Sequence, residues 1–528
     1  MATGCSVRKN EFYDSVFLMR VAKRIAEQPG VQQAAALMGT EKNRSLLADI
    51  QVSSPALDTA TPNDLMVAVV ADTEQTVRDI LDQLDQWMRR DRDSGKESAP
   101  RTLDAALARQ PDANLAVISV SGQYAAREAR HALERGLNVF VFSSNVSVDD
   151  ELALKEYARE RGLVVMGPDC GTSIIGGLGI GFANVVRRGP VGVIGASGTG
   201  IQEFTTLVHR WGSGISHAIG TGSRDLSDAI GGLSALSALD ALERDRATKV
   251  IAIVSKPPGA KTLAVLIERI SSCDKPVVTC FLGVRDELPG ANVRFRIART
   301  LDDAARIAVQ IATGKSPISN FQLPTPNFQP PTSNLQLPIS NLQSPISNLH
   351  FAPERKYIRG IFAGGTFCYQ AQQVLQDLGI RVYSNAPLPG NMRLSDPRRS
   401  IEHTLVDMGD EFFTDGRAHP MIDASLRRDR IVSEANDPRV AVLLLDFILG
   451  YNASADPVGD LIEAVTLAQS RARARGGTLA IIASVCGTDG DPQGLQRQQR
   501  QLQDAGVIVL PSSAEAAREC GRLVLAQG

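Results

Sequence analysis

The sequence of 528 residues lacks several features that would assign a chain to a familiar class. Its seven cysteines include no C-x-x-C pair, which argues against a disulfide framework and a structural zinc site. The formal net charge is only −2, so no positive excess would attract nucleic acid or an anionic membrane. No stretch approaches the roughly 20 apolar residues that span a bilayer, and Met1–Asn10 do not resemble a secretory signal. We therefore expect a cytoplasmic protein without a metal site, a nucleic-acid partner or a membrane partner.

The composition is that of a globular protein, with 43% hydrophobic and 22% charged residues. The length exceeds what one hydrophobic core supports and predicts about three or four domains. One domain boundary is visible between Lys315 and Pro353, where Pro-Ile-Ser-Asn recurs among glutamines and further prolines. Proline removes a backbone donor and clashes with the preceding helical turn, so this segment is predicted to be an extended or disordered linker.

Short β-branched segments alternate with amphipathic helical segments on both sides of the linker. This rhythm predicts βα units with parallel sheets. The strands are expected at 65–71, 115–120, 139–142, 163–166, 191–195, 250–254, 277–281, 358–362, 440–446, 479–484 and 507–510. Helices are expected at 125–135, 148–161, 199–211, 262–271 and 367–378. The first hundred residues are less regular and predict a small α+β domain, with helices at 12–28, 41–49 and 73–90 around strands near Ala34 and Val67.

The strongest local motif is the glycine-rich turn Gly195-Ala-Ser197-Gly198-Thr199-Gly200, between an apolar strand and a helix. Glycines allow close approach of a ligand to the backbone, and the exposed N–H groups at a helix start favour an anion. Ser197 and Thr199 add hydroxyl donors for phosphate oxygens. The alternative is a tight βα turn whose hydroxyls only cap the helix.

A second turn, Gly167-Pro168-Asp169-Cys170, also follows a short apolar strand. Asp169 and Cys170 are predicted to project at the carboxyl end of the sheet, where ligands of open α/β sheets bind. Cys170 could be a nucleophile, but the sequence shows no histidine partner nearby, so a buried packing thiol is favoured. Lys256, beside Pro257 and Pro258, is either a phosphate contact or a solvated lysine.

These two turns resemble the α subunit of succinyl-CoA synthetase, which has a Gly-Pro-Asn-Cys turn, then a Ser-Gly-Thr turn with a glutamate (here Glu203) in the following helix. Beyond the linker, three strand ends resemble the CoA-ligase domain of the β subunit more loosely: Gly364-Gly365-Thr366, Asn452 and Gly487-Thr488. The nearest resemblance is to the FdrA family, which joins α-like and β-like parts in one chain. The segments that carry it are Phe12-Tyr-Asp-Ser-Val, Ser255-Lys-Pro-Pro and Gly416-Arg417-Ala-His419-Pro-Met-Ile-Asp423.

The resemblance implies an α/β chain of several Rossmann-like or flavodoxin-like parallel-sheet domains in series after a small N-terminal α+β domain. The implied boundaries are 1–110 for the N-terminal domain, 111–188 for a CoA-binding-like Rossmann domain, 189–314 for an α-subunit-like flavodoxin-type domain, 315–355 for the linker and 356–528 for a CoA-ligase-like domain. It also implies substrate or phosphate contacts from both turns, Glu203, Lys256 and the three strand ends, with CoA as a candidate ligand.

The sequence departs from succinyl-CoA synthetase at the step that stores phosphate. That enzyme carries a phosphohistidine after the strand that ends here near Phe281, but residues 282–294 contain no histidine. Ser255–Gly259 replaces the acidic loop that supports the phosphohistidine. No ATP-grasp region is recognisable, and no CoA-phosphate loop is visible at 67–76. An autonomous ATP-dependent CoA ligase is therefore disfavoured.

Arg417, His419 and Asp423 lie within seven residues of one another and are predicted to be catalytic. Arginine can clamp a phosphate or carboxylate with two hydrogen bonds, and a neutral histidine can move a proton. The alternative is a surface loop in which Arg417 pairs with a carboxylate and His419 caps a turn.

Three functional hypotheses follow. The first is an acyl-CoA ligase or transferase of the succinyl-CoA synthetase type. The second is carbamoyl transfer between an acyl phosphate such as carbamoyl phosphate and a small amide or carboxylate such as oxamate, in purine and allantoin catabolism and with partner subunits or a homo-oligomer. The third is a non-catalytic subunit that keeps an inherited fold.

Overall fold

The computed structural model describes residues 1–11, 13, 15–40, 43–44, 47, 52, 54–88, 100–284, 294–314, 351–352, 354–414 and 417–526. Nearly all of the predicted linker lies outside these residues, as do 285–293, most of the predicted helix at 41–49, and Phe12, Asp14 and Gly416. The described chain forms two compact units. The first contains Met1–Ala113, Ser119–Ser121 and Glu411–His419, and the second contains the remainder.

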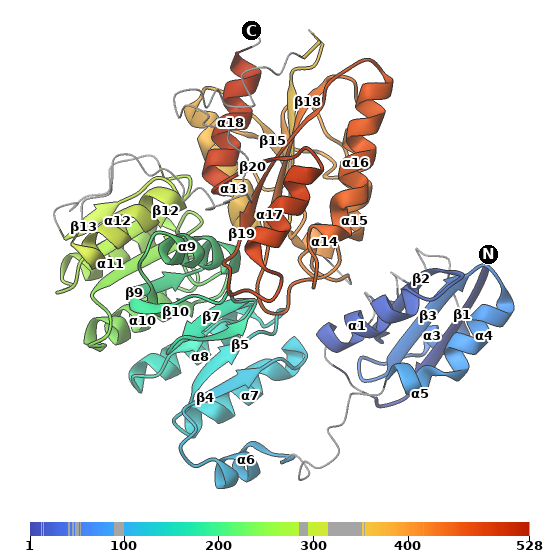
Figure 1. The fold of residues 1–528 in the computed structure, drawn as a ribbon. Coiled ribbons are helices and arrows are strands. Elements are labelled where there is room, and N and C mark those ends of the chain that lie inside the picture. Colours follow the sequence, from blue (N-terminus) through green and yellow to red (C-terminus); the bar gives the residue numbers. More distant parts are fainter. Residues whose placement is uncertain are drawn as a thin grey trace, which may run out of the picture. The chain divides into compact units, whose positions relative to one another are not determined.

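The first unit is built on a three-stranded antiparallel sheet in the order β1-β3-β2 (Figure 1). Its central strand is buried along its whole length because it has a neighbour on each side and helices against it. The strands are β1 (Ala2–Arg8), β2 (Val31–Met38) and β3 (Leu65–Ala71), and the helices are α1 (Ser15–Ala26), α3 (Pro55–Asp58), α4 (Glu74–Asp82), α5 (Leu84–Trp87) and α6 (Leu103–Arg109). The predicted α+β fold is confirmed. The strand β1 was not predicted, because an edge strand of small and polar residues carries no apolar alternation.

The second unit begins with a three-stranded parallel sheet in the order β4-β5-β6, with α7 and α8 as its crossover helices. These elements are β4 (Leu115–Ile118), α7 (Gly122–Glu134), β5 (Asn138–Val141), α8 (Val148–Glu160) and β6 (Val165–Met166). The buried Lys155 of α8 anchors this part to the next sheet. Its Nζ donates to Glu151, to the Thr221 carbonyl and to Asp225 at 2.7, 3.0 and 2.9 Å, so the buried charge is fully paired.

A seven-stranded sheet follows in the order β13-β12-β11-β9-β10-β7-β8. Its strands are β7 (Thr172–Ile175), β8 (Leu178–Gly181), β9 (Arg188–Gly195), β10 (Ile215–Gly220), β11 (Val250–Ser255), β12 (Val277–Phe281) and β13 (Phe295–Ile297). Its helices are α9 (Gly198–Arg210), α10 (Leu233–Arg244), α11 (Ala260–Ser271) and α12 (Leu301–Thr313). Strands β9 to β13 pair in parallel, whereas the unpredicted hairpin β7–β8 adds two antiparallel strands.

The C-terminal part forms a second seven-stranded sheet, wholly parallel, in the order β16-β15-β17-β14-β18-β19-β20 (Figure 1). Its strands are β14 (Tyr357–Phe362), β15 (Tyr383–Ser384), β16 (Met392–Arg393), β17 (Thr404–Asp407), β18 (Val440–Ile448), β19 (Ala480–Cys486) and β20 (Ile508–Leu510). The helices of this region are α13 (Gly365–Asp377), α15 (Ser425–Glu434), α16 (Gly459–Ala474), α17 (Leu495–Asp504) and α18 (Ser513–Leu525), whereas α14 (Glu411–Thr414) belongs to the first unit. The predicted fold class, α/β with parallel-sheet domains in series, is confirmed.

The two seven-stranded sheets are joined by buried polar contacts. Asp491 accepts hydrogen bonds from Asn184 Nδ2 and from the Val185 N–H, both at 2.7 Å, and Asn184 also donates to the Leu449 carbonyl. These contacts hold the segment before β9 against the loops after β18 and β19. Among the described residues, no helix is both long enough and apolar enough to cross a membrane.

Candidate functional site

The first glycine-rich turn lies between β9 and α9. Ser197 is the N-cap of α9, and its hydroxyl accepts a hydrogen bond from the Gly200 N–H at 3.3 Å. Gly195 cannot be replaced without movement, because a Cβ there would lie 2.4 Å from Ile201 Cγ1. Ser197, Gly198 and Thr199 are partly exposed. The predicted cap is therefore present, and the backbone of the first turn of α9 stays accessible to an anion.

The second turn connects β14 to α13 and contains Ala363, Gly364, Gly365 and Thr366. Its first two N–H groups are bound by Asp446 at 2.9 Å each, in the end of the neighbouring strand β18. Arg427 of α15 donates to Asp446 Oδ1 at 2.7 Å and to the carbonyls of Ile361 and Asp446. Burial raises the pKa of Asp446, and Arg427 acts in the opposite direction. This buried ion pair fixes the start of α13.

The structure brings the two turns into direct contact. The hydroxyls of Ser197 and Thr366 share a hydrogen bond. A Cβ on Gly364 would lie 3.1 Å from Thr199 Cβ, and a Cβ on Gly200 would lie 3.3 Å from Thr366 Cγ2. We call these segments, Gly195–Gly200 and Ala363–Thr366, the paired turns. Helices α9 and α13 begin side by side there, so the partial positive charges of two helix starts combine.

A lysine and a carboxylate lie beside the paired turns. Lys256, directly after β11, has its Nζ 4.8 Å from the ring centre of Tyr369 in α13. Asp407, the last residue of β17, has its Oδ2 2.5 Å from the position of a Cβ on Gly365. Burial raises the pKa of Asp407 to about 6, against the opposing effect of Lys256. The predicted residue Lys256 thus joins the site, whereas sequence reasoning did not identify Asp407, Asp446, Arg427 or Tyr369 as site residues. For the two aspartates, the available signal was a carboxylate at or near the end of an apolar strand, whereas Arg427 and Tyr369 lie within helices and carried no such signal.

The turn Gly167–Cys170 follows β6, and its contacts described below are with Ser223 and Val141. Asp169 Oδ2 accepts a hydrogen bond from the Ser223 hydroxyl at 2.6 Å. Cys170 is buried, and burial raises the pKa of its thiol to about 12. A thiol that stays protonated at neutral pH is a poor nucleophile, which supports the packing role favoured from the sequence. A Cβ on Gly167 would lie 2.4 Å from the Val141 carbonyl oxygen, so this glycine packs against β5.

Three other predicted contacts, Glu203, Thr488 and Asn452, take part in joining the two large sheets, and a fourth, Gly487, packs within the C-terminal sheet. Glu203 is buried in α9, accepts the Ser513 N–H at 3.0 Å, and has its pKa raised by burial. Thr488 donates its hydroxyl to the Val185 carbonyl at 2.6 Å, and Asn452 donates to the Gly181 carbonyl at 2.8 Å. A Cβ on Gly487 would lie 2.7 Å from Leu449 Cδ1. The described hydrogen bonds of Glu203, Thr488 and Asn452 therefore lead to other segments, not to the paired turns.

The predicted catalytic residues fall in different units. Arg417 and His419 belong to the first unit, and Asp423 belongs to the second. Arg417 is exposed, and its N–H donates to the Thr414 carbonyl at 3.1 Å. Asp423 is also exposed and accepts the Ser425 N–H at 2.9 Å at the start of α15.

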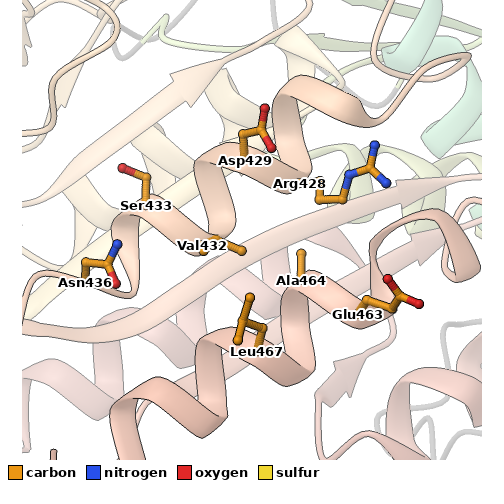
Figure 2. Close-up of a pocket in the computed structure, with 8 residues that line it drawn as sticks. All are labelled: Arg428, Asp429, Val432, Ser433, Asn436, Glu463, Ala464 and Leu467. Atoms are coloured by element: carbon orange, nitrogen blue, oxygen red, sulfur yellow. The ribbon is translucent and has the colours of Figure 1, made fainter. Parts of the chain in front are cut away.

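Two cavities lie near α15, and the smaller one borders the paired turns only at Ala363. One of about 470 Å³ opens between α15 and α16, with mixed polar and apolar walls (Figure 2). The other, of about 10 Å³, is lined in part by Ala363, Arg427 and Asp460, and it has room for about one water molecule. The larger cavity is lined by no residue of the paired turns, so the proposed site was not identified from cavity size.

Comparison with known proteins places these features in a family. Three family models match the chain in series: an AllF heavy metal-associated domain at 1–103, a CoA binding domain at 186–281 and a CoA-ligase at 361–523. The uncharacterized protein YahF of Escherichia coli (strain K12) is 43% identical over 514 residues, which are 97% of each chain. Subunit alpha 2 of the ADP-forming succinate–CoA ligase of Archaeoglobus fulgidus is 31% identical over 180 residues, 33% of this chain and 61% of that subunit.

Among solved structures, the dinucleotide-forming acetyl-coenzyme A synthetase 1 of Ca. Korarchaeum cryptofilum is 14% identical, with a TM-score of 0.31 over 78% of this chain and 83% of that chain. The CoA-binding and CoA-ligase matches define the class: an acyl-CoA synthetase-like protein related to succinyl-CoA synthetase. The identity to YahF along nearly the whole length shows the particular family, and the chain belongs to the FdrA family.

The name of the N-terminal match implies a heavy metal, but the residues present do not fit one. Residues 1–103 contain a single cysteine, Cys5, and no histidine. Cys5 lies on β1 opposite Ala68 of β3. Soft metals are held by several thiolate or imidazole ligands, which this domain does not supply. Among the described residues, no group of three histidine, cysteine or acidic side chains is placed to hold a metal ion.

Proposed function

We propose that this chain is the substrate-binding component of an acyl-transfer enzyme, and that it holds a phosphate-bearing acyl group at the paired turns. The observation that carries the proposal is the meeting of two helix starts, α9 and α13, through the Ser197–Thr366 hydrogen bond with Lys256 nearby. Two helix starts and an ammonium group supply N–H donors and positive charge for one anion. Asp446 accepts the Ala363 and Gly364 N–H groups and Ser197 accepts the Gly200 N–H, so the donors proposed for the anion are the remaining N–H groups of the two helix starts.

The chemistry that suits this site begins with an activated phosphate. A nucleophile attacks the acyl carbon, the bond from that carbon to the phosphate oxygen breaks, and phosphate leaves with the electron pair. Donors at the paired turns would stabilise the negative charge on the departing phosphate. Because residues 282–294 contain no histidine, the phosphate in this proposal stays on the ligand and is never transferred to a side chain.

Two substrate classes fit the proposal. The first is an acyl phosphate exchanged with CoA, since the CoA binding model matches 186–281 and that segment contains the start of α9. If CoA binds to this segment, its thiol would be the acyl acceptor, while the paired turns would hold the phosphate of the acyl phosphate. The second is carbamoyl phosphate with a small amide or carboxylate such as oxamate, acting with partner subunits. A chain that binds neither class would support a non-catalytic subunit.

Lys256→Ala is expected to weaken binding of acetyl phosphate or carbamoyl phosphate by roughly 10- to 100-fold, because one charge-assisted hydrogen bond is lost. Ser197→Ala is expected to weaken binding as well, by loosening both the cap of α9 and the contact with Thr366. Calorimetric titration of the full chain with acetyl phosphate, carbamoyl phosphate and CoA, each separately, measures these effects. Lys261→Ala is the matched control, since Lys261 is an exposed lysine in α11.

Each result of this titration is informative. Binding of carbamoyl phosphate alone favours carbamoyl transfer, whereas binding of both acetyl phosphate and CoA favours acyl exchange with CoA. If no anion binds, or if Lys256→Ala binds as tightly as the wild type, the site at the paired turns is refuted.

Arg417, His419 and Asp423 remain our proposed catalytic groups, with Arg417 holding the carboxylate of the acceptor by two parallel hydrogen bonds. Arg417→Ala is then expected to leave acyl phosphate binding unchanged and to lower phosphate release in the presence of oxamate by at least about tenfold. The assay uses the chain with the subunits that co-purify with it, and Arg399→Ala is a control because Arg399 is also exposed. Equal rates for both variants would remove Arg417 from the reaction.

A further inference from the structure

Asp407 is held rigidly beside the paired turns. Its backbone N–H donates to Asn385 Oδ1 and its carbonyl accepts from Asn385 Nδ2, both at 2.9 Å. One carboxyl oxygen, Oδ1, accepts the Gly409 N–H at 2.9 Å. These hydrogen bonds leave the side chain little freedom to rotate away from the paired turns. Only 4% of the residue is exposed.

The other oxygen, Oδ2, points at the first residue of α13. It lies 2.5 Å from the position of a Cβ on Gly365, so that only glycine leaves room for the carboxyl group. Among the described residues, Oδ2 makes no hydrogen bond. Because Asp407 keeps a small exposed fraction and its Oδ2 is aimed at the start of α13, this oxygen is available to a ligand or to a proton.

Asp407 and Asp446 occupy equivalent places but differ in charge balance. Asp407 is the last residue of β17 and Asp446 lies near the end of β18, the two strands that flank β14, and both carboxyl groups lie against the start of α13. Asp446 is paired with Arg427 and is satisfied by two N–H groups. Asp407 has no ion pair in the described part of the chain. The cation that lowers its pKa is Lys256, whose influence is opposed by Asp410 and Asp446.

The remaining titratable neighbours of Asp407 are on α13. They are Tyr369 and the buried Cys368, and each has its pKa raised by burial, so both stay neutral near pH 7. A bound phosphate would add a further negative charge next to Asp407. Two anions in contact in a buried place repel each other strongly. Protonation of the Asp407 carboxyl group removes this repulsion.

We infer that Asp407 binds the phosphate-bearing ligand together with a proton, and that its protonated carboxyl group donates Oδ2–H to a phosphate oxygen at the paired turns. This inference rests on the proposed function. The proton comes from solvent when the ligand binds. During transfer, the electron pair left on the phosphate oxygen by breakage of the bond to the acyl carbon takes this proton, and Asp407 returns to the carboxylate.

The proposal is tested by calorimetric titration of the full chain with sulfate, whose charge does not change between pH 5.5 and 8. Titrations at pH 7 in two buffers of different ionisation enthalpy give the number of protons taken up. With a pKa of about 6 in the free protein, the wild type should take up about 0.9 proton at pH 7. Its dissociation constant should then rise about tenfold between pH 7 and pH 8.

Asp407→Asn should bind sulfate with no proton uptake and with an affinity that does not change with pH, because its amide donates at every pH. Asp410→Asn, a carboxylate three residues away, should keep the proton uptake of the wild type. Sulfate binding by the wild type without proton uptake overturns the inference about Asp407, even if Asp407→Asn does not fold. Absence of sulfate binding at pH 5.5, where the acid form predominates, overturns the anion site itself and with it the proposed function.

Discussion

Replacing Asp302 by Asn is expected to stabilise the second unit at pH 8 by up to about 4 kcal/mol and to change its stability little at pH 4. Asp302 lies in the first turn of α12 and is buried. Burial raises its pKa to about 7 from 3.8, and the nearby Glu203 adds to the shift. A difference of about three pKa units corresponds to about 4 kcal/mol between the two protonation states.

The sign of the effect follows from which state holds the proton. Between about pH 4 and pH 7 the folded chain keeps a proton on Asp302 that the unfolded chain has released. The wild type therefore loses stability as the pH rises through this window, and above about pH 7 it bears the full cost of a buried carboxylate. The Asp302 Oδ2 atom, which has no hydrogen-bond partner among the described residues, is part of that cost.

The measurement is urea denaturation at pH 4, 5 and 8, followed by tryptophan fluorescence. The sequence has two tryptophans, and Trp211 is the C-cap of α9, the helix that carries Glu203. A Trp87→Phe background leaves Trp211 as the reporter. Asp303→Asn is the control, because Asp303 is the neighbouring but partly exposed acid. A wild-type stability that does not fall between pH 5 and pH 8 would contradict the prediction.

Replacing Asp446 by Ala is expected to destabilise the second unit by about 3–5 kcal/mol, because it leaves the buried Arg427 guanidinium without its carboxylate. The change also removes the acceptor of the Ala363 and Gly364 N–H groups at the start of α13. The same denaturation experiment at pH 7 measures the loss.

A double-mutant cycle separates the ion pair from the cap of α13. Arg427→Met should also destabilise strongly, but the double variant Arg427→Met, Asp446→Ala should cost at least about 1 kcal/mol less than the sum of the single changes. Arg428→Met is the matched control, since Arg428 is exposed beside the cavity in Figure 2, and its change should stay within about 0.5 kcal/mol. Strict additivity would show that Arg427 and Asp446 do not depend on each other.

Strands β3, β11, β12, β18 and β19 could be predicted from the sequence because each is a largely apolar segment that is buried along its whole length. Strand β18 is buried at all nine positions, and β3 at all seven, which is typical of central strands. Strands β7, β8 and β13 could not be predicted in this way. They are three or four residues long and rich in glycine or polar residues, and β15 and β16 are shorter still. Their pairing with distant strands, not their own residues, makes them strands.

The same distinction applies to the site. The sequence by itself determined that Gly195–Gly200 and Gly364–Thr366 are glycine-rich turns at helix starts, because a turn after an apolar strand is specified by adjacent residues. It could not show that Ser197 and Thr366, 169 positions apart, share a hydrogen bond. Nor could it tell Asp446 from Asp407. Only the tertiary structure places Arg427 beside the first and leaves the second buried without an arginine, because burial and ion pairing depend on segments that are distant in the chain.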